Sequence, residues 1–354
     1  MSRSSYIAAP SDGKDILRIL ESSAAKGQIE LLYTRRPDAY ASYMKEPGEA
    51  RVFVSKANGR TVGTCAELIR EVYIGGERVR AAYICGLKKE AGYPGHIGFG
   101  PGFLRGLQQG DFGYCFCSVL SDNTEAKRLF EAGSRLVRMR PVVGYRTYIV
   151  STRVRVKAPA HTMTFRRATP EDAASLLDFL HREGKKKDLF PVIDDFAQFP
   201  DLSVRDFFVL CKNGRIVAAA AAWNQAAYRQ YVVKKYRLPL RLCRALNPLL
   251  SALGYIRLPR ENEPLRFPML SFFVCEDDRE EESRILLGEA VREMARSYGM
   301  FVIGLPKGHP AAPLLDGLPS LHFDTTLYEI SFPGGQNDMR RADARHLFPE
   351  CGLL

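Results

Sequence analysis

An apolar run followed by a glycine-rich loop lies in the first third of the chain and decides how the rest is interpreted. The run is Arg80-Ala-Ala-Tyr-Ile-Cys-Gly-Leu87, and the loop is Tyr93-Pro-Gly-His-Ile-Gly-Phe-Gly-Pro-Gly102. The run has the composition of a buried strand. Glycines allow a tight passage from such a strand into a helix, which we expect over about residues 98 to 109.

The same alternation continues beyond this helix. Gly113-Tyr-Cys-Phe-Cys-Ser-Val-Leu120 predicts a second strand. Ser121-Asp-Asn-Thr-Glu-Ala-Lys-Arg-Leu-Phe-Glu-Ala-Gly133 predicts a helix that is capped at its start and ends at a glycine. Strands that alternate with helices form an α/β sheet with crossover connections, so the stretch predicts a mixed α/β fold.

Two parts of the chain repeat one order of elements. Each begins with a short strand, a capped turn and an amphipathic helix, first near Asp12 and again near Asp172. Each continues with two strands joined by an Asn-Gly pair, Asn58-Gly59 and then Asn213-Gly214, which favours a tight hairpin turn. The two turns lie 155 residues apart and the two caps 160, so the sequence predicts a tandem duplication.

The repeat predicts two domains and a tail. We place the first domain over residues 1–157, the second over 158–335 and the tail over 336–354. The segment from Thr152 to His161, with alternating valine and basic residues, is expected to be an edge strand or the linker between the copies. The second copy carries an insertion at residues 225–267, in which leucines with arginines on one side predict a helix packed on the body or between the domains. A helix on a membrane surface is the less favoured alternative, because Pro239 and Pro248 interrupt the stretch.

The composition is that of an ordinary globular protein, with 46% hydrophobic and 26% charged residues among 354. The longest apolar run, Ile216 to Trp223, is far shorter than the roughly 20 residues that cross a bilayer, and no apolar signal core follows Met1. We therefore expect a soluble, cytoplasmic protein. The eight cysteines form no C-x-x-C pair and the six histidines no H-E-x-x-H motif, so we expect reduced thiols and no metal site.

The net charge of +11 is concentrated in the first half. Residues 1–157 contain 25 Lys and Arg against 15 Asp and Glu, whereas the remainder contains 26 against 25. This asymmetry indicates a polyanionic partner for the first half: a nucleotide cofactor, a nucleic acid or an acidic surface. A basic surface that only keeps the protein in solution is the simpler alternative.

The glycine loop and the capped helix together resemble the GNAT superfamily of acyl-CoA-dependent N-acyltransferases. In that pattern (Arg/Gln)-x-x-Gly-x-(Gly/Ala) follows the fourth strand and Asn-x-x-Ala-x-x-Leu-Tyr follows the fifth. Gly98 and Gly100 occupy the two small positions, and the second element is matched by Asn123, Ala126 and Leu129. Motifs carry the resemblance over residues 6–150 and element order over 164–332. The chain therefore resembles a tandem GNAT protein, with two domains that each hold a mixed sheet flanked by helices.

The resemblance implies that the first domain binds acetyl-CoA or another acyl-CoA as co-substrate. Its pyrophosphate would lie on the amides of the glycine loop at the helix N-terminus, and its pantetheine arm would pair with the end of the preceding strand. Asn123 would face that arm, while Lys88, Lys127 or Arg128 would meet the 3′-phosphate. The residues implied for the cofactor are Cys85, Gly86, Leu87, Lys88, His96, Ile97, Gly98, Phe99, Gly100, Pro101, Asn123 and Lys127.

For catalysis the resemblance implies direct attack of a neutral amine on the thioester in a ternary complex. Backbone N–H groups would hold the oxyanion, and an acid would protonate the departing thiolate. Phe130 replaces the tyrosine that commonly serves as this acid, and Gly95 stands where the family has Arg or Gln. The acid would then be a water or one of four other residues, Tyr83, Tyr114, Cys117 and Ser118. Glu67 is our choice of general base, ahead of Tyr83 and Asp122.

The second copy lacks the glycine loop. We expect its strand, helix and strand over residues 269–275, 280–298 and 301–305, with acidic residues from Glu276 to Glu282 at the start of the helix. Such a cluster stabilises a helix N-terminus but repels a pyrophosphate. The sequence therefore assigns the cofactor to the first domain and a structural or acceptor-binding role to the second.

Three functions fit these patterns. The first is an N-acyltransferase that transfers an acyl group, most simply acetyl, to a small-molecule or protein amine. The second is a Fem-like transferase that depends on aminoacyl-tRNA, since those enzymes are also tandem GNAT folds and the first half is basic. The third is a CoA-binding or interaction module that has lost catalysis, which Phe130 and Gly95 support. The glycine loop favours the first of these, and binding of nucleic acid is not expected.

Overall fold

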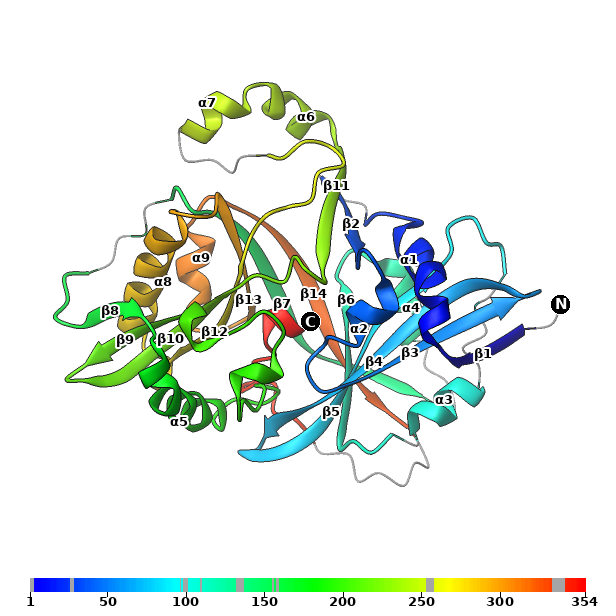
Figure 1. Ribbon diagram of the computed structural model, residues 1–354, viewed down its shortest axis with the longest axis horizontal. Coiled ribbons are helices and arrows are strands. Elements are labelled where there is room, and N and C mark those ends of the chain that lie inside the picture. Colours follow the sequence, from blue (N-terminus) through cyan, green and yellow to red (C-terminus); the bar gives the residue numbers. More distant parts are fainter. Residues whose placement is uncertain are drawn as a thin grey trace.

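The computed structural model is centred on one twelve-stranded mixed sheet to which both halves of the chain contribute (Figure 1). It describes residues 3–25, 29–95, 97, 101–108, 110–131, 137–154, 156, 159–252, 258–332 and 341–354. The strands of the sheet follow in the order β1-β3-β4-β5-β6-β14-β7-β13-β12-β10-β9-β8. The mixed α/β class expected from the sequence is confirmed.

The first half contributes the strands Arg3–Ile7 (β1), Ile29–Thr34 (β2), Glu49–Ala57 (β3), Arg60–Ile74 (β4), Glu77–Lys89 (β5), Tyr114–Leu120 (β6) and Arg138–Ser151 (β7). Its helices are Gly13–Glu21 (α1), Ala39–Tyr43 (α2), Pro101–Gln108 (α3) and Thr124–Glu131 (α4).

The second half contributes the strands Thr164–Arg167 (β8), Phe207–Lys212 (β9), Arg215–Trp223 (β10), Gln230–Tyr236 (β11), Met269–Cys275 (β12), Met300–Pro306 (β13) and Ser320–Ser331 (β14). Its helices are Ala173–Gly184 (α5), Leu238–Ala245 (α6), Asn247–Ala252 (α7), Glu280–Met294 (α8) and Ala312–Asp316 (α9).

Both expected Asn-Gly hairpins are confirmed. Asn58 and Gly59 join β3 to β4 with φ values of 50° and 80°, and Asn213 and Gly214 join β9 to β10 with 52° and 77°. A two-residue turn with both φ values positive has the twist that the flanking strands require, and Asn and Gly tolerate this conformation best.

The two halves also repeat a β-bulge that the sequence analysis did not predict. The residue seven places after each hairpin asparagine, Cys65 in β4 and Ala220 in β10, faces two residues of the next strand instead of one. These pairs are Gly86-Leu87 in β5 and Phe272-Phe273 in β12, and the first residue of each has a positive φ, 60° and 53°. The equivalent position of the two bulges supports the duplication.

The last strands of the two halves are exchanged. β14, from the end of the second half, lies between β6 and β7, and β7 in turn pairs with β13 of the second half (Figure 1). The strand near the junction is therefore β7, in the middle of the sheet, and Thr152 to Val154 form a turn after it. An edge strand at Thr152–His161 was the wrong expectation, and the domain boundaries proposed from the sequence stay a prediction.

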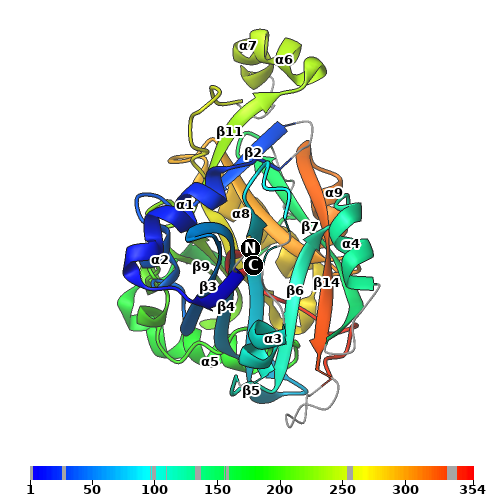
Figure 2. The ribbon, with the colours of Figure 1, turned by 90° about the vertical axis from the view of Figure 1, so that its right-hand side faces the viewer.

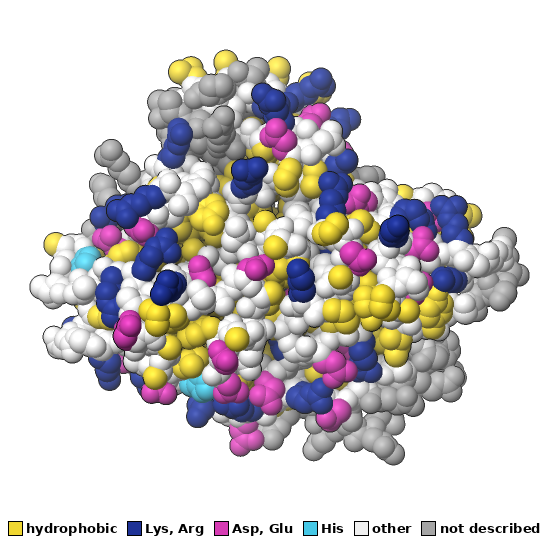
Figure 3. All heavy atoms as spheres, viewed as in Figure 1, with side chains coloured by type: hydrophobic (Ala, Val, Ile, Leu, Met, Phe, Trp, Pro, Cys, Tyr) yellow, Lys and Arg dark blue, Asp and Glu magenta, His cyan; other side chains and the backbone are white. Residues whose placement is uncertain are grey.

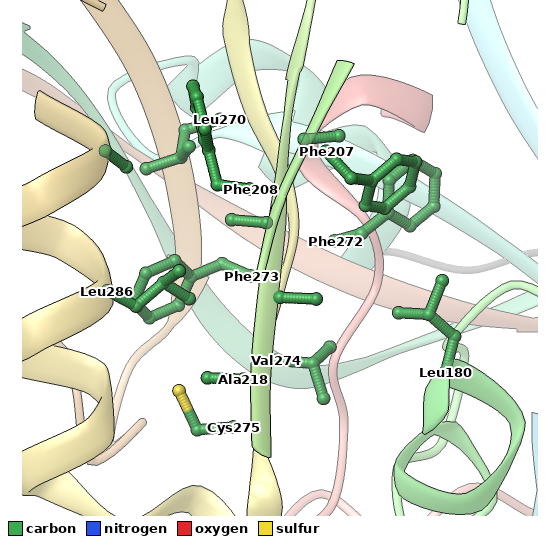
Figure 4. Packing of buried hydrophobic residues seen from close by; sticks show 14 of the residues in the cluster. Leu180, Phe207, Phe208, Ala218, Leu270, Phe272, Phe273, Val274, Cys275 and Leu286 are labelled. Atoms are coloured by element: carbon green, nitrogen blue, oxygen red, sulfur yellow. The ribbon is translucent and has the colours of Figure 1, made fainter. Parts of the chain in front are cut away.

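Helices cover both faces of the sheet. In the second half α5 and α8 lie on opposite faces, so that Phe207 and Phe272 pack on the α5 side and Phe208 and Phe273 on the α8 side (Figure 4). In the first half α1 packs on one face of β4, and α3 places Phe103 and Leu107 on the other, against Phe53 and Cys65.

The insertion forms β11, α6 and α7. β11 pairs with β2 in a separate two-stranded sheet, and the two helices stand away from the body (Figures 1 and 2). Four of the leucines that were expected to pack against the body are instead exposed, so the expectation of a packed helix was wrong for Leu238, Leu242, Leu246 and Leu249. Within the described residues, none of the helices has the length and apolar character needed to span a bilayer.

Candidate functional site

The candidate site is a gap between the neighbouring strands β5 and β6. The two strands pair in parallel from Ala81 with Tyr114 to Ile84 with Cys117. Beyond that point β5 keeps its pairing with β4 as far as Lys89, whereas β6 continues along β14. The strands therefore separate, and in the described part of the chain no strand lies on the β6 side of β5 after Ile84.

The bulge lies at the start of this unpaired stretch. Gly86 has a left-handed backbone conformation, and a Cβ at this residue would lie 2.4 Å from the hydroxyl oxygen of Tyr43 in α2. Only glycine fits both the backbone and the close approach of the tyrosine. Leu87, the next residue, is 46% exposed, so the unpaired stretch reaches solvent. Cys85, Gly86 and Leu87, assigned to the cofactor from the sequence, thus form the β5 side of the gap.

Tyr83 and Ser118 lie on one face at the mouth of the gap. The Tyr83 hydroxyl and the Ser118 Oγ are 2.6 Å apart. Tyr83 pairs with Phe116, and Ser118 lies two residues after Phe116 on β6. Burial raises the pKa of Tyr83, so the phenol keeps its proton at neutral pH and has one to donate. Ser118 is half-buried and within reach of the same proton.

Glu67 and Cys117 lie on the other face of the sheet, because side chains alternate along a strand. Tyr83 packs in the cluster with Phe116, whereas Cys117 packs with Ile69, two residues from Glu67 on β4. The structure therefore does not bring the predicted trio of Glu67, Tyr83 and Cys117 together. Burial raises the pKa of the Cys117 thiol to about 12, so at neutral pH it is a core thiol and not a nucleophile.

Glu67 is fully buried and one of its carboxylate oxygens lies 2.7 Å from the Arg51 guanidinium. Burial raises its pKa to about 7, more than Arg51 lowers it, and Glu49 adds to the increase. A carboxyl group with this pKa exchanges its proton near neutral pH, which is the property that a general base requires.

A cluster of buried guanidinium groups lies on the Tyr83 face. The Glu46 carboxylate accepts from Arg35 at 2.6 Å and from Arg229 at 2.8 Å, and all three side chains are buried. Arg70, on the same face of β4, is near enough to lower the pKa of Glu46, but its two terminal nitrogens have no hydrogen-bond partner among the described residues. Three guanidinium groups thus act on one carboxylate.

The positive field of this cluster reaches the gap. Burial raises the pKa of Cys85 to about 11, and Arg35, Arg229 and Arg70 each oppose the increase. Negative charge that develops beside Cys85, which is only partly buried, is therefore stabilised by fixed cations. The arginines were missed from the sequence, although Arg70 alternates with the buried Leu68 and Val72 and is the one charged residue on that apolar face of β4.

The two lysines assigned to the cofactor, Lys88 and Lys127, lie in different surroundings. The Lys88 ammonium donates to the backbone oxygens of Leu20 and Ser23 at the end of α1, and burial lowers its pKa to about 8. It is therefore held by a helix C-terminus in this structure. Lys127 lies half-buried on α4, whose first turn is capped by the Asn123 side chain, 3.1 Å from the Ala126 amide.

The glycine loop lies mostly outside the described residues. His96, Gly98, Phe99 and Gly100 are among those not described, and so the loop stays a prediction. Of the remaining loop residues, Ile97 packs on Gly63, where a Cβ would lie 2.4 Å from Ile97 Cγ2, and Pro101 is the first residue of α3.

The corresponding gap in the second half is filled by the end of the chain. β12 and β13 pair in parallel only at Met269 and Val302. Residues 349–354 occupy the space beyond, and the Glu350 carboxylate accepts the backbone N–H of Phe272 at 2.6 Å, at the bulge itself. Phe272 and Phe273 are both buried, whereas Leu87, which corresponds to Phe273, is exposed. The second gap is therefore closed.

Within the described part of the chain, no group of three His, Cys, Asp or Glu side chains has the geometry to hold a metal ion. That no metal takes part in the chemistry stays a prediction from the sequence.

No protein-family model matches the sequence, and no curated protein matches it. Solved structures are similar in fold. The N-myristoyltransferase of Saccharomyces cerevisiae with bound myristoyl-CoA has a TM-score of 0.60 at 11% identity, over 98% of this chain and 84% of that one. A protein from Enterococcus faecalis described as a probable N-acyltransferase has a TM-score of 0.52 at 10% identity, over 95% and 74%.

A GCN5-related N-acetyltransferase from Anabaena variabilis also has a TM-score of 0.52 at 10% identity, over 93% of this chain and 72% of that one. At sequence identities of 10% and 11%, structural similarity shows only the fold. The chain has the GNAT fold over both halves, as the sequence resemblance implied.

Proposed function

We propose that this protein is an acyl-CoA-dependent N-acyltransferase whose reaction takes place at the gap between β5 and β6. The observation that supports this best is the difference between the two halves. The first gap has a bulge, an unpaired main chain and an exposed Leu87, whereas the second has the same bulge closed by Glu350. We therefore propose that an extended ligand binds beside the strand in the first half.

The residues present fit an acyl-CoA. The unpaired main chain of Cys85 to Leu87 offers hydrogen bonds to the amides of a pantetheine arm, as one strand does to another. The basic excess of the first half favours a ligand that carries phosphates. An acyl-CoA supplies an activated thioester, and the protein holds it and moves the protons.

In this reaction the amine nitrogen forms a bond to the thioester carbonyl carbon, and the carbon–sulfur bond breaks. Cations Arg35, Arg70 and Arg229 stabilise the negative charge that collects on the carbonyl oxygen and then on the sulfur. The thiolate takes a proton from Tyr83, and Ser118 orients that hydroxyl. Glu67, with its pKa of about 7, is buried on the opposite face of the sheet from Tyr83, so the proton that the amine loses would reach it only through a chain of water molecules or other side chains.

Which acyl group the donor carries is a separate part of the proposal. The similar yeast structure holds myristoyl-CoA, and others in the comparison are N-acetyltransferases. We propose acetyl-CoA as the simplest donor, and a test with several chain lengths decides between the two.

Binding is tested by the melting temperature with acetyl-CoA, myristoyl-CoA and free CoA. We expect a saturable increase with at least one of them. The Leu87→Asp variant, which places an anion on the unpaired stretch, should lose the increase. Ile7→Asp is its control, because Ile7 is an exposed strand residue on β1, 59% exposed. No increase with any of the three ligands would refute acyl-CoA binding.

Catalysis is tested by release of the free CoA thiol with a panel of amines. Tyr83→Phe should lower the rate at saturation by about 100-fold or more, because a positioned acid contributes this much. Tyr114→Phe is the matched control, since its hydroxyl is also buried but has no hydrogen-bond partner among the described residues. Equal rates for both variants would exclude Tyr83 as the acid while leaving the binding result standing.

A further inference from the structure

The two helices of the insertion carry a continuous apolar face that the rest of the protein does not cover. Four leucines project from α6 and α7, and their exposed fractions are 76% for Leu238, 68% for Leu242, 60% for Leu246 and 66% for Leu249. Leu238 and Leu242 lie one turn apart on α6, Leu246 stands at the joint between the two helices, and Leu249 lies on α7. We call residues 237–252 the helical arm.

Two prolines do not interrupt this face. Pro239 is the second residue of α6 and Pro248 the second residue of α7, in the first turn, where a helix needs no amide hydrogen. The prolines therefore begin the two helices, and the leucines continue from one helix to the next. The arm stands at one end of the molecule, and hydrophobic side chains appear at its tip beside Lys and Arg side chains (Figures 1 and 3).

Basic residues accompany the leucines. Between Gln230 and Leu258 the sequence contains six Lys and Arg and no Asp or Glu. Arg237, Arg241 and Arg244 recur at the same helical spacing as the leucines, and Arg237 and Arg241 are exposed. Arg244 lies over the Tyr236 ring at 6.0 Å. An apolar face with cations along its side matches a surface that offers hydrocarbon beneath anionic headgroups.

We propose that the helical arm docks on the surface of a membrane that contains anionic phospholipid, with its leucines in the acyl region and its arginines among the headgroups. A second copy of the chain fits less well, because a symmetric contact would bring two cationic faces together without anions to compensate. A nucleic acid would match the arginines but leave the leucines in water. The proposal is independent of the acyltransferase proposal.

The experiment uses the full chain and a reporter tryptophan. The protein has a single tryptophan, Trp223, which is fully buried in the core, so its emission should not respond to vesicles. In a Leu242→Trp variant we expect a blue shift and a gain in intensity with vesicles in which one lipid in three is phosphatidylglycerol and the rest phosphatidylcholine. Vesicles of phosphatidylcholine alone should give a much smaller response.

Vesicle co-sedimentation measures the contributions of the two kinds of side chain. Leu242→Asp with Leu246→Asp should weaken binding at least tenfold, since it replaces apolar insertion by charge repulsion. Arg237→Gln with Arg241→Gln should weaken it roughly 10- to 30-fold and reduce its dependence on salt. Ile7→Asp, an exposed apolar residue away from the arm, should bind like the parent protein.

Four results would overturn the proposal. One is the absence of any response of Leu242→Trp to anionic vesicles while the protein is folded. Another is unchanged vesicle binding in the double aspartate variant. The third is a dimer, found by light scattering, that the double aspartate variant abolishes in a protein that does not bind vesicles, which would assign the face to a second copy. Binding of RNA by the parent protein without binding of vesicles would assign it to nucleic acid.

Discussion

Replacement of Glu67 by glutamine should remove a pH-dependent loss of stability. Glu67 is buried, and its pKa rises from the ordinary 4.5 to about 7. Between these pH values the folded protein keeps a proton that the unfolded chain has released, so the free energy of unfolding falls as the pH rises. A shift of this size corresponds to about 3 kcal/mol, complete above pH 7 and absent below pH 4.5. Glu67→Gln carries no such proton.

Urea unfolding of both proteins at pH 4.5, 6 and 8 measures the effect. The stability of Glu67→Gln relative to the parent should increase by about 3 kcal/mol across this range. A constant offset of up to about 1 kcal/mol against the variant is expected because Arg51, itself only 23% exposed, loses its carboxylate partner. Glu49→Gln is the control, since its exposed carboxylate acts on Glu67 only from a distance. Parallel stability curves for Glu67→Gln and the parent would show that Glu67 ionises normally and would remove it as the base.

Two further predictions concern the buried side of the gap. Glu46→Gln should destabilise the protein by about 3–5 kcal/mol in urea unfolding, because Arg35 and Arg229 lose the carboxylate that they share. Burial alone would raise the pKa of Glu46, but the arginines outweigh it and hold this pKa at about 2. The stability that this ion pair gives to the parent protein should therefore be lost as the pH falls from about 4.5 towards 2. Gly86→Ala should lower the free energy of unfolding by about 2 kcal/mol or more, since the residue has a left-handed backbone and its new Cβ would meet the Tyr43 hydroxyl. Adding Tyr43→Phe should recover part of this loss of stability. If the effects of the two substitutions simply add, the residues are not in contact.

Local chemistry made the repeat predictable. Each Asn-Gly pair sits between apolar runs, and only a tight turn with two positive φ values satisfies that arrangement, so both hairpins were found at the right residues. The buried strand at residues 269–275 was likewise predicted with the bounds that β12 has. Such features depend on residues that are neighbours in sequence.

The exchange of strands was not predictable in this way. β7 and β14 each have the composition of a strand, but nothing in either says that β14 inserts between β6 and β7, because pairing depends on distant partners. The same limit applies to the site. Arg35, Arg70 and Arg229 come from three distant segments, and only the fold brings them around Glu46.

The closed gap of the second half indicates what the open one requires. At the bulge of the second half the Phe272 N–H is bound by a side chain, and a buried backbone N–H needs such an acceptor. In the second half the acceptor is the Glu350 carboxyl group, which the chain itself supplies and which is buried with Phe272; burial raises its pKa. Beside Gly86, by contrast, Leu87 is exposed, and three arginines oppose the increase in the pKa of Cys85. A gap that holds a carboxyl group of the chain itself in one half is left open to a ligand in the other, and this is the reason to look for acyl transfer at Gly86 rather than at Phe272.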